Sequence, residues 1–176
     1  EFHFTNRIVG IVGPNGVGKT NVLDAIYYLS FTKSYFSRPD AQNVHHAYQG
    51  LRIDGKYNIN NNDVTISCII RENLKKEFYF DEEMYPKHSL HLGKIPCVMI
   101  APDDVQIITG ASEERRKLMD SLLCQIHPPY LKYLIQYNKI LLQRNSLLKI
   151  ANETGNLDSL LLETLNEQLM ANGNPI

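Results

Sequence analysis

The sequence predicts an α/β fold with an antiparallel side sheet and a helical second lobe. Three observations lead to this prediction. A glycine-rich segment at residues 13–20 stands between an apolar run and a helical pattern, three alternating runs follow over 51–81, and helical periodicity dominates from 102 onward. We expect a first lobe over residues 1–101 and a second, helical lobe over 102–176.

The glycine-rich segment has the spacing GxxxxGK(S/T) of a phosphate-binding loop. Its residues are Gly13, Pro14, Asn15, Gly16, Val17, Gly18, Lys19 and Thr20. Glycines open backbone conformations that other residues avoid, so consecutive N–H groups can surround phosphate oxygens. Lys19 is placed to reach the β and γ phosphates, and the Thr20 hydroxyl to bind Mg²⁺. The motif, with Asn21 beside it, predicts a site for a nucleoside triphosphate and Mg²⁺.

The flanks of the loop are of the types that such a loop needs. Arg7–Val12 is expected to form the strand that leads into it. Asn21–Phe31 is expected to begin a helix whose positive N-terminal end points at the phosphates. The segment Thr32–Gly50 is polar and rich in turn residues, which predicts a long loop over the nucleotide site.

Short strand-like runs follow this loop. Leu51–Tyr57, Val64–Arg71 and Lys75–Asp81 are rich in Ile, Val, Tyr and Phe and are separated by turn residues, so they predict an antiparallel meander. Lys87–Gly93 is expected to form a helical turn. The apolar run Cys97–Ala101 predicts a buried central strand.

The remaining residues predict three helices. Ser112 is expected to cap a helix that ends near Ile126, where a His-Pro-Pro sequence stops it. The next helix is expected over Pro129–Ala151 and the last over Leu157–Ala171. The apolar residues of the second helix that fall on one expected stripe are Leu131, Leu134, Ile135, Leu141, Leu142 and Leu148.

Composition excludes some classes of protein. The chain has 176 residues with 18 Lys and Arg against 19 Asp and Glu, so no global positive charge indicates a nucleic-acid partner. Cys68, Cys97 and Cys124 are widely spaced, which favours buried thiols in a reducing compartment. No apolar run is long enough for a membrane span, so we expect a cytoplasmic protein.

Other possible sites are weaker. The run ending in Asp103 and Asp104 resembles the metal-binding strand end of nucleotide hydrolases, but Pro102 turns the chain first, which favours a helix cap over a metal ligand. The six histidines have no spacing typical of a zinc site, so no metal other than Mg²⁺ at Thr20 is expected.

A local basic surface is the remaining candidate for DNA binding. Between Arg115 and Lys149 the only acidic residue is Asp120. Lys132 and Lys139 recur on one helical face with Arg144 beside it, a surface that could follow a phosphate backbone; the other interpretation is an ordinary solvated helix face. The candidate DNA-binding residues are Lys132, Lys139 and Arg144.

Several segments together resemble a known family. The string Gly13–Ile26 resembles the nucleotide loop of ABC-type ATPase heads of the SMC kind. With the later segments added, nearly the whole chain resembles the RecF family of bacterial recombination-repair proteins. Those segments are Tyr27–Ser30, Ala101–Val105, Gly110–Asp120, Tyr130–Leu131, Gln143–Lys149 and Leu169–Gly173.

The resemblance implies a partial ABC-type P-loop head that binds ATP, with a helical second lobe. It also implies an ATP-dependent homodimer that binds single-stranded and duplex DNA at gaps and junctions, with RecO and RecR as partners and roles in replication and the SOS response. In the family a basic residue often lies near Phe36; here Lys33 and Arg38 flank that place, which puts a phosphate-sensing role there in doubt.

Both ends of the sequence suggest an N-terminal fragment of such a protein. The family's opening strand is expected before Glu1, and its serine-bearing signature and Walker B carboxylates after Ile176. The resemblance implies that the full-length protein is a weak, DNA-stimulated ATPase. The fragment contains no catalytic residue, and we expect it to bind ATP weakly and to hydrolyse it poorly or not at all.

The competing interpretation is a small P-loop kinase for a nucleotide or metabolite, which would have about this length. A kinase needs an arginine-rich lid over the transferred phosphoryl group, whereas the loop 32–50 holds only Lys33 and Arg38 as basic residues. A third possibility is a scaffold in which bound ATP is structural.

Overall fold

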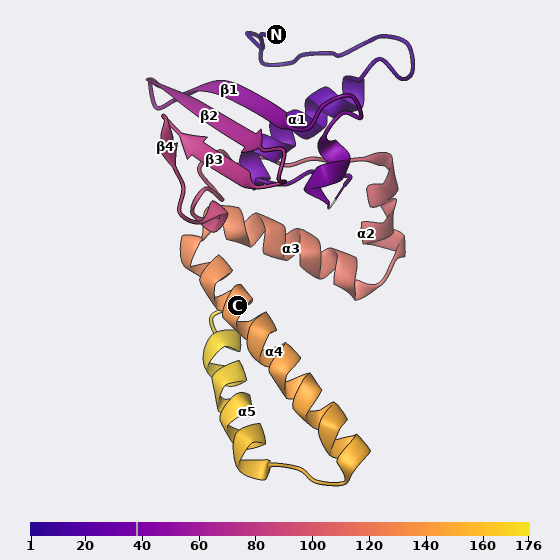
Figure 1. Ribbon diagram of the computed structural model, residues 1–176, viewed down its shortest axis with the longest axis vertical. Coiled ribbons are helices and arrows are strands. Elements are labelled where there is room, and N and C mark those ends of the chain that lie inside the picture. Colours follow the sequence, from indigo (N-terminus) through magenta and orange to yellow (C-terminus); the bar gives the residue numbers. More distant parts are fainter. Residues whose placement is uncertain (38) are drawn as a thin grey trace. The chain divides into compact units, whose positions relative to one another are not determined.

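The computed structural model of the chain describes residues 1–37 and 39–176 (Figure 1). They divide into two compact units, one of residues 1–91 and 97–99, the other of residues 92–96 and 100–176. None of the helices in the described part combines the length and apolar character that crossing a membrane requires.

The first unit contains one helix and one sheet. Helix α1 spans Lys19–Phe31, and a short 3-10 turn covers Asp40–Asn43. The strands are β1 (Leu51–Ile59), β2 (Asn62–Ile70), β3 (Lys76–Phe80) and β4 (Glu83–Met84), antiparallel in the order β1-β2-β3-β4. The predicted meander is confirmed, and the short strand β4 was not predicted.

The hairpin between β1 and β2 depends on two asparagines. Asn60 and Asn61 have φ angles of 52° and 64°, and the flanking residues Ile59 and Asn62 pair directly. A two-residue hairpin turn of type I′ has positive φ at both positions, and asparagine tolerates this better than most non-glycine residues. The register of the pair follows from this turn.

The core of the first unit lies between α1 and one face of the sheet. Ile66, Cys68 and Phe78 are fully buried on that face, and Tyr28 and Leu29 of α1 pack from the other side. A Cβ at Gly55 would lie 2.6 Å from Leu29 Cδ1, so glycine lets α1 approach β1 closely. The other face of the sheet carries the polar residues of β1, such as Arg52 and Asp54.

Two predicted strands are absent. Residues 7–12 and 97–101 have no strand structure, and within the described residues every strand pairs only inside the meander. A strand needs a hydrogen-bonded neighbour for its N–H and C=O groups. Ile8 and Val12 are 88% and 91% exposed, and Ile100 is 84% exposed. Both segments contain the apolar residues that predicted a strand, but no neighbouring strand in the described part pairs with either of them.

The second unit is helical. Its elements are a 3-10 turn at Pro102–Val105, then α2 (Gln106–Thr109), α3 (Ser112–Ile126), α4 (Pro128–Thr154) and α5 (Ser159–Gly173). The expected helical turn near residue 90 belongs to the first unit and covers His88–Leu90. The predicted cap of α3 was wrong by one residue, because the N-cap is Ala111 and Ser112 is the first helical residue.

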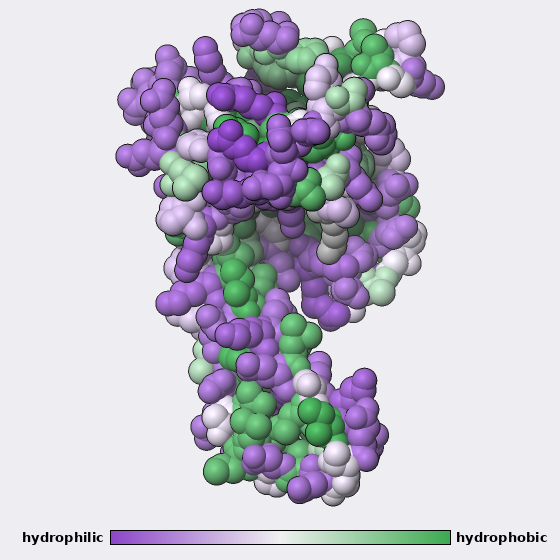
Figure 2. All heavy atoms as spheres, viewed as in Figure 1, coloured by the Kyte–Doolittle hydropathy of each residue, from purple (hydrophilic) through white to green (hydrophobic). Residues whose placement is uncertain are grey.

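Helices α4 and α5 form an antiparallel hairpin (Figure 1). Ile140 and Leu165 are its buried apolar residues, whereas Ile135 and Leu142 of the predicted stripe are 50% and 71% exposed. Figure 2 shows hydrophobic residues gathered on the surface of this hairpin. The stripe prediction was wrong for these two residues, because Ile140 lies on the covered face of α4 and they do not.

Candidate nucleotide-binding site

The phosphate-binding loop has the backbone conformation that its glycines allow. Gly16 and Gly18 have φ angles of 82° and 97°, in the left-handed region that side chains disfavour. A Cβ at either position would meet nothing within 4 Å. The backbone angle, rather than crowding, therefore requires glycine here.

Helix α1 begins immediately after this loop. Its N-cap is Gly18, which offers no side-chain cap, so the first N–H groups of the helix remain available to an anion. The Lys19 ammonium donates to the carbonyl oxygens of Gly13 and Pro14 at 2.8 and 2.7 Å. Lys19 thus spans the loop, and Thr20 and Asn21 are exposed on the first turn of α1.

These groups fit a triphosphate with its metal ion. Backbone N–H groups, a helix N-terminus and an ammonium are the donors that phosphate oxygens accept, and a threonine hydroxyl is an oxygen ligand that Mg²⁺ takes. The loop residues and the first residues of α1 lie in one continuous segment, from Gly13 to Asn21. That these residues bind the nucleotide stays a prediction.

The segment after α1 is tied back to the helix by a carboxylate. Asp24 accepts hydrogen bonds from the Ser34 hydroxyl and the Tyr35 N–H group, both at 2.7 Å. Ser34 Oγ accepts in turn from the N–H groups of Phe36 and Ser37, at 3.1 and 2.9 Å. Ser34 is buried. We call Asp24 and Ser34 the anchoring pair.

A second polar group holds the same region to the sheet. Asp40 accepts a hydrogen bond from the Tyr28 hydroxyl and pairs with Lys76 at 2.9 Å, and Lys76 also donates to the Thr32 carbonyl at 2.8 Å. Burial, followed by the hydrogen bond to Asp40, raises the pKa of Tyr28 far above its ordinary value. The first part of the loop after α1 is therefore tied both to the helix, through Asp24, and to the sheet, through Lys76.

The basic residues near Phe36 cannot both be placed. Lys33 is exposed at the start of the loop, Phe36 is 53% exposed, and Arg38 lies outside the described residues. The prediction that a phosphate-sensing role is doubtful here stays a prediction.

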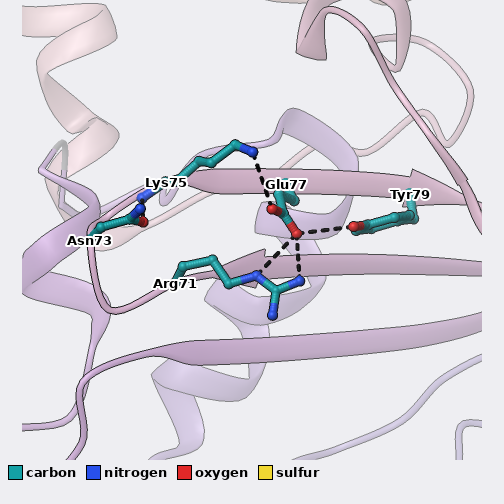
Figure 3. A network of polar contacts seen from close by, with 5 residues as sticks. All are labelled: Arg71, Asn73, Lys75, Glu77 and Tyr79. Carbon is teal, nitrogen blue, oxygen red and sulfur yellow. Dashed lines mark hydrogen bonds and ion pairs between the residues drawn. The ribbon is translucent and has the colours of Figure 1, made fainter.

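A separate polar network lies on the outer face of the sheet (Figure 3). Glu77 accepts from the Arg71 guanidinium at 2.7 Å and from the Tyr79 hydroxyl at 2.9 Å, and Lys75 lies 3.5 Å from its other oxygen. The hydrogen bonds from Arg71, followed by that from Tyr79, lower the pKa of Glu77 to about 2. A hollow of about 470 Å³ lined in part by Arg52, Ser67 and Tyr79 lies over this face. Since acids and bases pair there, it offers no concentrated charge to a phosphate.

One of the two acidic residues after residue 101 helps to close the start of a 3-10 turn. Asp104 accepts a hydrogen bond from the Ala101 N–H group at 2.6 Å, at the start of the 3-10 turn. The N-cap is Ala101, and Asp104 is the residue that bonds back to it. Among the described residues no group of three His, Cys, Asp or Glu side chains is placed to hold a metal ion.

The thiols and the candidate DNA-binding residues occupy varied positions. Cys68 and Cys124 are buried and Cys97 is half-buried. Lys132 and Lys139 are exposed on α4, whereas Arg144 donates to Asn166 of α5 at 2.7 Å. The structure thus separates Arg144 from the two lysines, and DNA contact by all three stays a prediction.

Several polar residues that form contacts in the first unit belong to no sequence motif. Asp24 and Asp40 were passed over, as was His91, which is fully buried with Nε2 2.7 Å from the Leu29 carbonyl oxygen. The available signal was spacing: Asp24 follows Thr20 by four residues, which places both on one face of the helix.

Comparison with known proteins gives consistent results. Residues 8–90 match the family model described as "AAA domain, putative AbiEii toxin, Type IV TA system". The chain is 41% identical over 169 residues to the DNA replication and repair protein RecF of Parabacteroides distasonis, covering 96% of this chain and 45% of the relative. It is 42% identical over 175 residues to RecF of Flavobacterium johnsoniae, covering 99% and 49%.

Solved structures agree with these relatives. The chain matches "the recombination mediator protein RecF-ATPrS in RecFOR pathway" with a TM-score of 0.85 at 30% identity, covering 93% of this chain and 44% of the other. The corresponding RecF-ATP structure gives 0.82 at 30% identity, covering 92% and 43%. The chain spans about half the length of the curated relatives it matches. Its fold is that of part of an ABC-type P-loop head with an antiparallel side sheet and a helical second lobe.

Proposed function

Over the residues that it spans the chain belongs to the RecF family, and from that premise we propose that it is the ATP-binding part of a DNA repair and recombination protein. The observation that carries the proposal is the loop ahead of α1. Gly16 and Gly18 adopt positive φ and Lys19 spans the loop, so backbone donors and an ammonium converge on one place.

The proposed ligands are ATP and Mg²⁺. The nucleotide-binding residues are the continuous segment Gly13–Asn21, within which Lys19 contacts the β and γ phosphates and the Thr20 hydroxyl binds the metal ion. The names of the matching solved structures, which include ATP, support the choice of nucleotide. Bound Mg²⁺ neutralises phosphate charge, and the chain's own groups hold and orient the phosphates.

The further steps belong to the whole protein. We propose that ATP favours a homodimer, because a ligand that binds the closed dimer better than the open monomers shifts the population toward the dimer. The dimer would bind single-stranded and duplex DNA at gaps and junctions in the bacterial cytoplasm, with RecO and RecR as partners, in support of replication and the SOS response. Weak DNA-stimulated ATP hydrolysis would release it.

Nucleotide binding by the full-length protein tests the proposal. Calorimetric titration with ATP and Mg²⁺ is expected to show one site, and Lys19→Ala is expected to weaken binding by about a hundredfold, since charge-assisted hydrogen bonds to phosphate are lost. Lys56→Ala, which removes an exposed lysine of β1, is the matched control and should bind as the natural protein does. Equal affinity in the Lys19 and Lys56 variants would overturn the proposal.

DNA binding is measured in the same protein with and without ATP, on gapped duplex and on intact duplex. Tighter binding to the gapped duplex in the presence of ATP is expected. ATP-independent binding of both substrates would remove the nucleotide-gated part of the proposal and leave nucleotide binding itself intact. No specific observation favours a kinase.

A further inference from the structure

The anchoring pair lies one helical turn from the proposed metal ligand. Thr20 and Asp24 are four residues apart in α1, which corresponds to about 6 Å along the helix axis on one face. Side chains of a helix tilt toward its N-terminus, so the Asp24 carboxylate is directed toward the turn that carries Thr20. Asp24 binds Ser34 and Tyr35, and Ser34 binds the N–H groups of the next two residues, so residues 34–37 lie beside that turn.

These residues are held as one body with the helix. The three consecutive N–H groups of residues 35–37 all donate to the anchoring pair. The Tyr35 ring also meets the Tyr27 ring of α1 edge-on, with centroids 5.0 Å apart. A segment whose backbone donors are satisfied in this way is ordered before any ligand arrives, so binding does not have to order it.

We propose that Asp24 is a positioning residue that holds residues 34–37 against the phosphate-binding helix as a wall of the nucleotide site beside the terminal phosphate. This inference rests on the proposed function. In the proposed site the Thr20 hydroxyl would hold the Mg²⁺ that accompanies the β and γ phosphates, so the face of α1 that carries Thr20 and Asp24 would be the face at the terminal phosphate. A triphosphate reaches this wall and a diphosphate ends short of it.

Two substitutions loosen the wall without touching the phosphate loop. Asp24→Asn keeps the shape of the side chain but turns one oxygen into an NH₂ donor, which cannot accept from the Ser34 hydroxyl. Ser34→Ala removes the acceptor for the N–H groups of Phe36 and Ser37. The matched control is Ser89→Ala, which changes an exposed serine of the first unit outside residues 34–37 and outside the phosphate loop.

The experiment is calorimetric titration of the full-length protein with ATPγS and with ADP, each with Mg²⁺. Each of the two variants is expected to bind ATPγS about tenfold more weakly while ADP affinity changes by less than about twofold. The double variant is expected to bind ATPγS about as tightly as each single variant does, because both substitutions break the same hydrogen-bonded unit. Ser89→Ala is expected to bind both nucleotides as the natural protein does.

The outcomes separate this inference from the proposed function. If the natural protein binds neither nucleotide, the proposed function fails and the inference with it. If the natural protein binds both and the Asp24 and Ser34 variants bind them equally well, only the inference is overturned. An equal loss for ATPγS and ADP also overturns it, because that pattern indicates general structural damage. Should Asp24→Asn not fold, Ser34→Ala decides the matter alone.

Discussion

At the scale of single residues, carboxylates in the first unit join elements that are distant in the sequence. Asp24 joins α1 to the segment after it, Asp40 joins that segment to β3, and Glu77 gathers Arg71 and Tyr79 on the sheet. Charge-assisted hydrogen bonds of this kind are stronger than neutral ones. Asp24 and Asp40 hold the segment that follows the phosphate-binding helix, whereas the Glu77 network lies apart on the outer face of the sheet.

The ionisation of Glu77 makes the free energy of unfolding depend on pH in the acid range. Its pKa in the folded protein is about 2 against an ordinary value of 4.5, so its contribution is present above the ordinary value and is lost as pH falls from 4.5 toward 2. We expect Glu77→Gln to lower the thermal midpoint at neutral pH and to match the natural protein near pH 2. Thermal melts across this range check it. Glu82 is an exposed turn residue, so Glu82→Gln should have the same thermal midpoint as the natural protein at every pH.

At the scale of elements, local signals account for most boundaries. Helix α3 was predicted to within one residue of its bounds, because its periodicity is enclosed by Gly110 on one side and by a His-Pro-Pro stop on the other. Helix α5 begins where Asp158 can cap it, two residues later than predicted. Strand neighbours are not local, and the expected strands at 7–12 and 97–101 failed for that reason.

The cap of α5 is a test at this scale. Asp158 Oδ1 accepts a hydrogen bond from the Leu161 N–H group at 2.9 Å. Asp158→Ala should destabilise the second unit by about 1 kcal/mol and speed amide exchange at Leu161, while Asp158→Asn, an equally good cap, should change little. Denaturant unfolding together with hydrogen exchange measures both. An asparagine variant as unstable as the alanine one would show that charge, rather than capping, is what matters.

At the scale of the whole molecule, the local distribution of charge indicates more about DNA binding than the net charge does. The chain has a formal charge of −1, yet α4 carries exposed Lys132 and Lys139. Arg144 is bonded to Asn166 inside the hairpin, so the exposed basic surface is smaller than the sequence suggested. The salt dependence of DNA binding tests whether this surface contacts a phosphate backbone.

Charge reversal at Lys132 and Lys139 in the full-length protein tests this surface. Each phosphate contact contributes about 0.9 to the slope of log affinity against log salt, so we expect the slope to fall by roughly 2. Lys56→Glu, a reversal on the sheet, should leave the slope unchanged. Binding titrations at several salt concentrations measure it, and an unaltered slope in the α4 variant would assign these lysines to a solvated face.

The sequence by itself determined the phosphate loop, the meander and the helices, because glycine spacing, alternation and helical periodicity act between residues close in the chain. Only the tertiary structure decided which apolar residues of α4 are covered and which polar side chains meet. Ser34 lies ten residues after Asp24 and Lys76 lies far beyond Asp40. Such pairs form only when the chain folds back on itself, and no local pattern records which partner a carboxylate will find.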